Sequence, residues 1–176
     1  MGRIAGSLSR CDLRRCFVLI LVLCGTQKQD FSRMIREVEK LADDHQIIVQ
    51  AGHTLYQSDQ MEIFDFLASE KLKLLYEKAT YIITHGGAGS LFQGIKSGKK
   101  TIVFPRLQKY GEHVDDHQLQ LASKLEDLGY LLIFNDGDDI VDVFDRVNRM
   151  KPVAYHLKGE IPFLVDQQLA GILGDG

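Results

Sequence analysis

The part of this sequence best suited to binding a ligand through its backbone is the run His85-Gly86-Gly87-Ala88-Gly89-Ser90. Three glycines and an alanine remove side-chain bulk and allow positive φ angles, so backbone N–H groups can approach a ligand closely. A helical pattern begins directly after the run, and the N-terminus of a helix favours phosphate. Because Phe92 breaks G-x-G-x-x-G and no P-loop fits, the run predicts phosphate binding without implying NAD or ATP. The alternative is a tight turn whose glycines serve packing alone.

A second polar stretch, residues 105–118, contains seven charged or imidazole side chains. Within it, the Glu112 carboxylate can accept hydrogen bonds from two hydroxyl groups at once, which suits a ribose, with His117 and Gln118 facing the same ligand. His113 and His117 are four residues apart, so a metal site is an alternative, although the pattern is not H-E-x-x-H. A solvated loop with a capped helix start is the third interpretation.

These two stretches need a scaffold, and the hydrophobic pattern predicts strands that alternate with helices. The expected strands are 17–23, 47–49, 63–67, 81–84, 101–104 and 130–134. The expected helices begin near 30–32, at 69 with Ser69 as a cap, at 91, at 115–116, at 138 and at 165. This alternation predicts an α/β class, with a single Rossmann-like domain and a mainly parallel sheet. In such a sheet ligands bind at the carboxyl ends of the strands, where both polar stretches and a third, Gly25-Thr26-Gln27, are expected.

The size and charge of the chain limit what it can be. It has 176 residues, 45% of them hydrophobic and 26% charged, with a formal net charge of -3. These values favour one globular domain and exclude collagen-like, coiled-coil and disordered classes. The acidic balance argues against binding nucleic acid through bulk charge. The chain is also small for an enzyme that encloses two substrates.

The first 24 residues invite two interpretations. Four arginines in residues 1–16 precede the apolar run Phe17–Cys24, as in a signal peptide. The run is far shorter than the ~20 residues of a membrane span, and a buried parallel strand explains it better. We therefore expect residues 1–16 to be a poorly ordered extension and residues 17–176 to form the domain. The three cysteines form no CxxC pair and indicate reduced thiols, typical of the cytoplasm.

From Phe17 to about Phe134 the chain resembles the donor-binding half of a GT-B glycosyltransferase with a family 28 C-terminal domain. The residues that carry the resemblance are the strand ending Gly25-Thr26-Gln27, the run His85–Ser90, Gly98-Lys99-Lys100 before a strand, and Pro105-Arg106…Gly111-Glu112-His113…Asp116-His117-Gln118. More narrowly, the chain is similar to the small subunit of two-part transferases. These act on dolichol-linked glycans in eukaryotes and in bacterial exopolysaccharide or capsule synthesis, and the second motif favours the bacterial branch.

The resemblance also implies roles for individual residues. Gly86, Gly87, Ala88, Gly89 and Ser90 would hold the diphosphate of a UDP-sugar such as UDP-GlcNAc. Glu112 would contact the ribose or the donor sugar, and Asp116, His117 and Gln118 would line the sugar side. Gly25, Thr26 and Gln27 would face the acceptor across the cleft. Members of the family generally need no metal, and no cofactor is expected because the UDP-sugar is a substrate.

Four further side chains are candidates for the chemistry. Arg106 and Lys109 could add positive charge near the diphosphate, which is our own inference and not part of the resemblance. His85 and His113 are candidates for the general base. Each of these histidines could also be an ordinary structural residue.

The resemblance further implies a partner, because a complete GT-B enzyme has two halves and this length predicts one. We expect a heteromeric, inverting hexosyltransferase whose membrane-anchored partner binds a lipid-linked acceptor at the inner face of the membrane. Two alternatives stay open. One is a stand-alone UDP-sugar-processing enzyme that uses His113 and His117, and the other is a non-catalytic nucleotide-sugar-binding protein.

Overall fold

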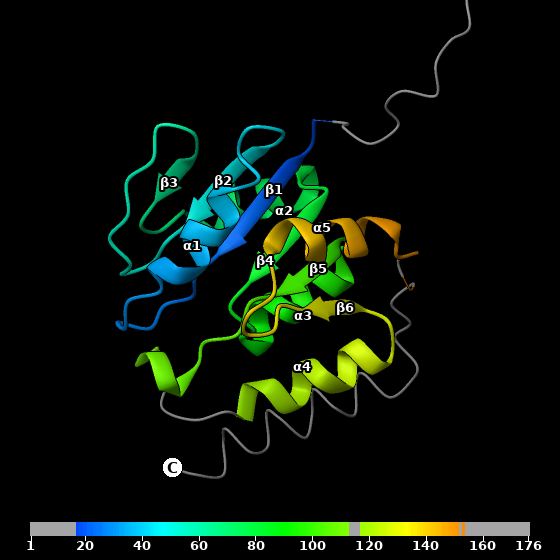
Figure 1. The fold of residues 1–176 in the computed structure, drawn as a ribbon. Helices are drawn as coiled ribbons and strands as arrows, with labels where there is room; N and C mark the ends of the chain where they lie inside the picture. Colours follow the sequence, from blue (N-terminus) through cyan, green and yellow to red (C-terminus); the bar gives the residue numbers. More distant parts are fainter. Residues whose placement is uncertain (1–16, 113–116, 152, 154–176) are drawn as a thin grey trace, which may run out of the picture.

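A computed structural model describes residues 17–112, 117–151 and 153 of the chain (Figure 1). Its strands are β1 (Leu19–Leu23), β2 (Gln46–Gln50), β3 (Glu62–Phe64), β4 (Tyr81–Thr84), β5 (Lys100–Val103) and β6 (Leu131–Ile133). Its helices are α1 (Ser32–Glu39), α2 (Ser69–Lys78), α3 (Ala88–Lys96), α4 (His117–Asp127) and α5 (Ile140–Arg149), with a 3-10 turn η1 (Gln108–Tyr110). Strands and helices alternate, so the predicted α/β class is confirmed.

The six described strands form one parallel sheet in the order β3-β2-β1-β4-β5-β6. The chain builds outward from β1 to β3 on one side, then crosses back and builds from β4 to β6 on the other. The order therefore reverses between β1 and β4. Open parallel sheets bind ligands at such a reversal, outside the carboxyl ends of the strands.

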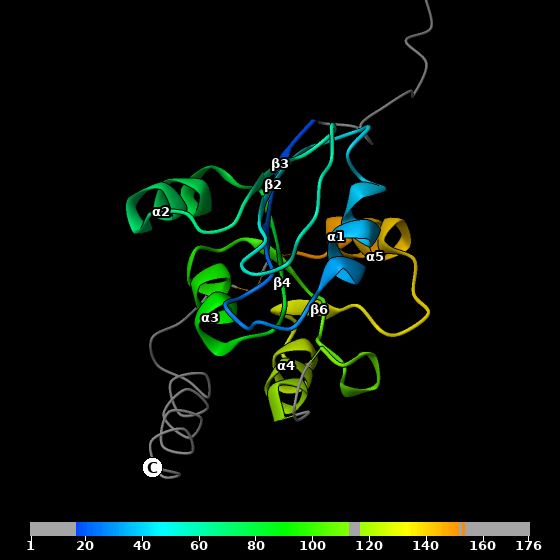
Figure 2. The ribbon, with the colours of Figure 1, turned by 90° about the vertical axis from the view of Figure 1, so that its left-hand side faces the viewer.

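Helices cover both faces of this sheet (Figure 2). Alternate side chains of β1 point to opposite faces. Ile20 and Val22 pack in the core with α1 and α5, whereas Leu21 and Leu23 pack in the core with α2. A third cluster joins α3 and α4 to β5 and β6. Because both faces are covered, the central strands β1 and β4 are almost wholly buried and do not alternate between apolar and polar residues.

Most predicted elements are present, and two details differ. The strand at Tyr81–Thr84 has the predicted bounds, but α3 begins at Ala88, so its first turn lies within the glycine run. Ser69 was expected to cap a helix; it is instead the first residue of α2, and Ala68 is the cap without a side-chain hydrogen bond. The helix expected at 165–173 and the extension at 1–16 lie outside the described residues.

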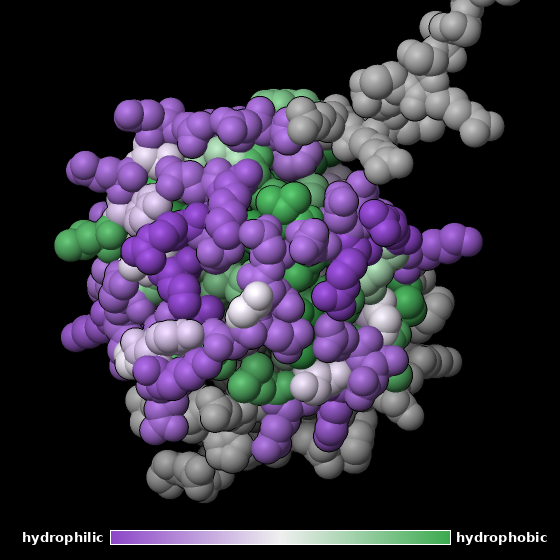
Figure 3. Space-filling view, in the orientation of Figure 1, coloured by the Kyte–Doolittle hydropathy of each residue, from purple (hydrophilic) through white to green (hydrophobic). Residues whose placement is uncertain are grey.

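The face seen in Figure 1 is predominantly hydrophilic, with apolar side chains in small separate groups (Figure 3). This agrees with α1 and α5 turning their apolar sides inward, where Met34, Ile35, Val143 and Phe144 are buried. Among the described residues, none of the helices combines the length and the apolar character needed to span a bilayer.

Candidate functional site

The turn between β4 and α3 is built almost entirely from backbone. We call residues 85–90 the glycine turn. Gly86 has a φ of 94°, which strains any residue with a Cβ. Gly87 is the N-cap of α3 and no side chain caps the helix. The first turn of α3 therefore presents N–H groups and the positive end of the helix dipole at the carboxyl edge of the sheet.

The three glycines of this turn have different local environments. A Cβ on Gly87 would lie 2.4 Å from the Nε2 atom of His85, and one on Gly86 would lie 3.1 Å from Val103. A Cβ on Gly89 would meet nothing within 4 Å. Gly89 is the second residue of α3, and glycine has a lower helix propensity than alanine. Neither packing nor backbone geometry in the described structure thus requires glycine at position 89.

The side chain of Ser90, the last residue of the turn, faces a neighbouring helix. It forms a hydrogen bond with the hydroxyl of Tyr76 on α2. Burial raises the pKa of Tyr76 to about 12, and the bond with Ser90 opposes that increase. The backbone N–H of Ser90 is therefore the group through which this residue would contact a phosphate.

His85 lies between the loops that follow β1 and β4. A Cβ on Gly25 would lie 2.8 Å from its ring, and one on Gly87 would lie closer, at 2.4 Å. The Nδ1 atom lies 3.2 Å from the carbonyl oxygen of Leu23. This packing explains why glycine occurs on both sides of the ring, and it places the imidazole at the strand-order reversal. A catalytic role for His85 stays a prediction.

The loop after β1 approaches two other loops at this edge. Gly25 has a φ of 85°, and a Cβ on Gly52 after β2 would lie 2.2 Å from the carbonyl oxygen of Gly25. Thr26 is exposed and Gln27 is half-buried. The structure thus brings the predicted acceptor-side residues next to the glycine turn, although no acceptor contact is tested.

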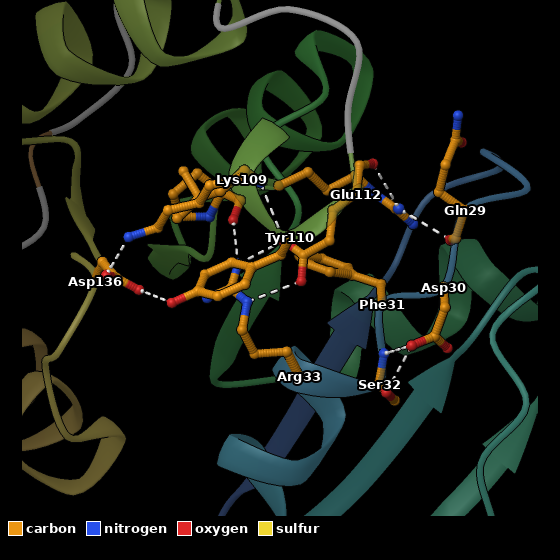
Figure 4. Close-up of polar contacts among 12 residues, drawn as sticks. Gln29, Asp30, Phe31, Ser32, Arg33, Lys109, Tyr110, Glu112 and Asp136 are labelled. Carbon is orange, nitrogen blue, oxygen red and sulfur yellow. Dashed lines mark hydrogen bonds and ion pairs between the residues drawn. The ribbon is translucent and has the colours of Figure 1, made fainter.

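On the other side of the edge, ionic side chains join the loops after β1 and β5. We call Arg33, Arg106 and Glu112 the arginine clamp. Arg33 and Glu112 are labelled in Figure 4. Arg33 donates from Nε to Oε1 of Glu112 at 2.8 Å and from Nη2 to Oε2 at 2.7 Å. The same Nη2 donates to the carbonyl oxygen of Pro105 at 2.8 Å, and the backbone N–H of Leu107 donates to Oε2 at 3.0 Å. The predicted ribose contact of Glu112 stays a prediction, and these bonds limit its remaining acceptor capacity.

Arg106 is the buried part of the clamp, with 4% of the residue exposed. Its Nη1 donates to the carbonyl oxygens of Gln29 and Glu112, and its Nη2 donates to that of Cys24. Its guanidinium also lies 4.3 Å from the ring centroid of Phe31. Desolvation lowers the pKa of Arg106, although arginine stays charged in proteins. This cation therefore fixes two loops to one another; its predicted role near a diphosphate stays a prediction.

The segment that carries η1 is also fixed to the end of β6. The Tyr110 hydroxyl donates to Oδ1 of Asp136 at 2.8 Å, and Lys109 pairs with the same carboxylate. These hydrogen bonds lower the pKa of Asp136 and raise that of Lys109. Lys109 was expected near the diphosphate, and the structure gives it this partner at the rim.

The remaining predicted site residues are only partly described. His113 and Asp116 lie outside the described residues, and His117 and Gln118 begin α4, so only the position of their backbone is known. The metal alternative at His113 and His117 stays a prediction. Elsewhere, in residues 17–112 and 117–151, no group of three or more potential metal ligands occurs.

Sequence reasoning missed Arg33, which is the residue that holds Glu112. It lies 79 positions before its partner, on a helix that the sequence shows as ordinarily amphipathic. The one available signal was its place in the first turn of the helix after Gly25-Thr26-Gln27, close to Phe31. Nothing local in the sequence pairs it with Glu112.

Comparison with known proteins gives a consistent result. Residues 19–160 match the family described as the glycosyltransferase family 28 C-terminal domain. The UDP-N-acetylglucosamine transferase subunit ALG13 of Candida glabrata is 26% identical over 121 residues, which cover 68% of this chain. The aligned region spans 56% of that relative's length.

Solved structures show the same fold at low sequence identity. The glycotransferase of kitacinnamycin has a TM-score of 0.59 at 19% identity, covering 85% of this chain and 39% of its own. The NMR structure of ALG13 has a TM-score of 0.54 at 17% identity, and the match covers 79% of this chain and 91% of the ALG13 chain. The calicheamicin glycosyltransferase CalG4 has a TM-score of 0.60 at 15% identity, and the match covers 76% of this chain and 35% of the CalG4 chain.

Proposed function

Because the chain belongs to the glycosyltransferase family 28 C-terminal domain family, with the fold of one GT-B half, we propose that it binds the UDP-sugar donor of a glycosyltransferase. The observation that carries this proposal is Gly89. Glycine at this position favours the helix less than alanine would, and no neighbouring atom requires the absence of a Cβ. It leaves the first turn of α3 open at the edge where such sheets bind ligands. A diphosphate lying against the backbone at this point accounts for the glycine.

The glycine turn would hold the diphosphate through the N–H groups of residues 86–90. Each charge-assisted hydrogen bond contributes roughly 1.5–3 kcal/mol. In the transfer step a bond forms between an acceptor oxygen and the anomeric carbon, while the bond from that carbon to the β-phosphate oxygen breaks. UDP leaves with added negative charge, which the positive end of α3 stabilises directly.

The other predicted residues take places around this diphosphate. Glu112 follows β5, next to β4 in the sheet, and would accept from the ribose, with Asp116, His117 and Gln118 continuing toward the sugar. Gly25, Thr26 and Gln27 would face the acceptor. The base that removes the acceptor proton is His85, His113 or a residue of the partner.

Nucleotide binding tests this proposal. We expect UDP to bind the wild-type chain in isothermal titration calorimetry. Gly89→Ala should weaken binding about tenfold or more, the equivalent of one charge-assisted bond, while the melting temperature rises because alanine favours the helix. The control is Arg146→Ala, at an exposed position of α5 away from the glycine turn, and it should bind UDP like the wild type. A folded wild-type chain that binds no UDP would refute the proposal.

We also propose that the acceptor half of the cleft comes from a second, membrane-anchored chain. The related ALG13 is itself described as a subunit, and this chain covers 39% and 35% of two similar transferase chains. The acceptor would be a lipid-linked saccharide at the inner face of the membrane, in bacterial exopolysaccharide or capsule synthesis. Sugar transfer should then appear only when the partner is added, and transfer by this chain alone would contradict the two-chain arrangement.

A further inference from the structure

A groove of about 340 Å³ opens beside the arginine clamp, between the start of α1 and the segment that carries η1. Arg33, Arg36 and Tyr110 are among the residues that line it. None of its lining residues belongs to the glycine turn. The groove is therefore separate from the glycine turn, and a diphosphate bound on that turn would not fill it.

Arg33 is held in one orientation at this groove. Its Nε and Nη2 atoms donate to the Glu112 carboxylate, and Nη2 also donates to the carbonyl oxygen of Pro105. Its guanidinium lies 4.6 Å from the ring centroid of Phe104 and 4.8 Å from that of Tyr110, which Figure 4 shows beside it. An arginine that is mobile in solvent loses side-chain entropy when a partner immobilises it. Arg33 has already lost much of this freedom on folding, so binding to it costs less.

Two arginines at the groove keep unused N–H donors. The Nη1 atom of Arg33 makes no hydrogen bond with any residue that the structure describes, and this side chain is 21% exposed. Arg36 lies three residues later on the same side of α1. It is exposed, and it donates to no residue within the described ranges. A planar guanidinium with free N–H groups is suited to a carboxylate.

The charge around the groove favours the same kind of ligand. Arg33, Arg36 and the buried Arg106 lie at or beneath it, against the two carboxylates of Asp30 and Glu112. The surroundings are therefore positive, although the whole chain has a formal net charge of -3. An acidic group would meet a favourable local field here.

Tyr110 adds a fixed aromatic surface to the groove. The residue is 49% exposed, and its hydroxyl is held by Asp136 at 2.8 Å. Tyrosine and arginine are enriched among the residues that contribute most to protein–protein interfaces. Arg33 and Tyr110 thus have the composition and the rigidity of an interface centre. They lie near the carboxyl edge of the sheet, in the loops after β1 and β5.

We propose that this groove is the docking site of the acceptor-binding partner chain, which packs on Tyr110 and places an acidic side chain against Arg33 and Arg36. The inference rests on the proposed function, because it needs the two-chain arrangement. Glu112 serves the interface indirectly, by holding Arg33. Because the glycine turn does not line the groove, the partner and the donor can be bound at the same time.

The affinity for the partner tests this inference. The probe is the membrane-anchored chain that supports sugar transfer with this protein, purified in detergent and immobilised for biolayer interferometry at low salt. Arg36→Glu should weaken binding about tenfold or more, because like charges then meet across the interface. Arg33→Met should weaken it about thirtyfold or more, as expected for a central interface residue. Arg146→Glu makes the same charge change at an exposed position of α5 and should bind like the wild type.

Two further measurements exclude an effect through unfolding. Arg36→Glu should bind UDP with the wild-type affinity in titration calorimetry, because the groove is separate from the glycine turn. Added salt should weaken partner binding more in the wild type than in Arg36→Glu, since it screens the attraction to the acidic group. Equal salt dependence in the two proteins would contradict the acidic contact.

The remaining outcomes distinguish the inference from the function on which it rests. Unchanged partner binding in both Arg33→Met and Arg36→Glu would overturn the inference and leave the two-chain arrangement intact. Self-association, or binding to phosphatidylglycerol vesicles, that Arg36→Glu abolishes while partner binding persists would also overturn it, because the groove would then hold a second copy or a lipid headgroup. If no membrane-anchored chain binds the wild type or supports transfer, the proposed two-chain function fails instead.

Discussion

The glycine turn and the arginine clamp lie at the ends of neighbouring strands, yet they are built in opposite ways. The turn consists of six consecutive residues, and its features are backbone angles and missing side chains. The clamp joins Arg33 to Glu112 across 79 residues, with Arg106 buried between the two loops. The glycine turn exposes backbone N–H donors because it lacks bulky side chains, whereas the arginine clamp holds two loops together through buried charged groups.

The two constructions suit two different ligand groups at the carboxyl edge of the sheet. A phosphate needs several N–H groups with little around them, which a helix start with glycines provides. A hydroxyl needs one acceptor in a fixed direction, which a flexible carboxylate provides only when other groups hold it. Added bulk in the turn should therefore weaken phosphate binding, whereas loss of a partner in the clamp should weaken the fold.

The largest expected effect is the loss of the buried cation in the clamp. Arg106→Met keeps much of the volume but removes the donors to the carbonyls of Cys24, Gln29 and Glu112. Because a buried polar group without a partner costs about 1–3 kcal/mol, we expect the free energy of unfolding to fall by about 3 kcal/mol. Urea denaturation measures this change. Arg146→Met is the exposed control, expected within about 0.5 kcal/mol of the wild type, and an equal loss in both variants would contradict the role of the clamp.

An added methyl group in the turn should have the next largest effect. Gly86→Ala must adopt a φ of 94° with its Cβ 3.1 Å from Val103. Such a conformation costs roughly 1–3 kcal/mol, so we expect a loss near 2 kcal/mol in the same urea experiment. Gly89→Ala, three residues later, should change stability in the opposite direction. If both substitutions destabilised the fold equally, the distinction between packing and ligand-facing glycines would be wrong.

The same contrast explains what could be predicted from the sequence. Local composition and periodicity were sufficient to predict the glycine turn, the strand at Tyr81–Thr84 and the α/β class, because each depends on residues that are neighbours in the sequence. The start of α3 at Ala88 was missed because glycines conceal a first helical turn. The partnership of Arg33 and Glu112 depends on how the sheet order brings two loops together, and nothing in either segment alone specifies it.

A smaller effect is expected at Cys24, which lies beneath the clamp. Burial raises the pKa of its thiol to about 12, outweighing the opposite influence of Arg106. At pH 8 the thiol is therefore neutral, and alkylation by iodoacetamide should be slow in the folded protein. Arg106→Met should speed it about tenfold, because local opening becomes easier by about 1.4 kcal/mol. Mass spectrometry of the Cys24 peptide measures the rate, with Gly86→Ala as a comparison; equal acceleration in both variants would show that the clamp does not control this opening.

The smallest effect is expected at the rim, where Asp136 contacts Lys109 and Tyr110. Hydrogen bonds from these two residues lower the pKa of Asp136, so its folded form binds a proton less readily than its unfolded form. The stability that it contributes is therefore present above the unfolded pKa, about 3.9, and is lost as the pH falls through the lower folded pKa. The pair is exposed, and salt should weaken it further.

Asp136→Asn should accordingly be less stable than the wild type at pH 7 in low salt, and the difference should shrink toward zero as the pH falls below about 3.9. Urea denaturation at pH 7 and at acid pH measures the difference, and Lys109→Met should reduce the same pH dependence by removing its main cause. The glycine turn contains no carboxylate, so the deficit of Gly86→Ala should stay constant through the acid range in which carboxylates titrate. If the Asp136→Asn deficit also stayed constant, the rim contact would not depend on the charge of Asp136. Charge would then stabilise the loop after β5 only through the clamp.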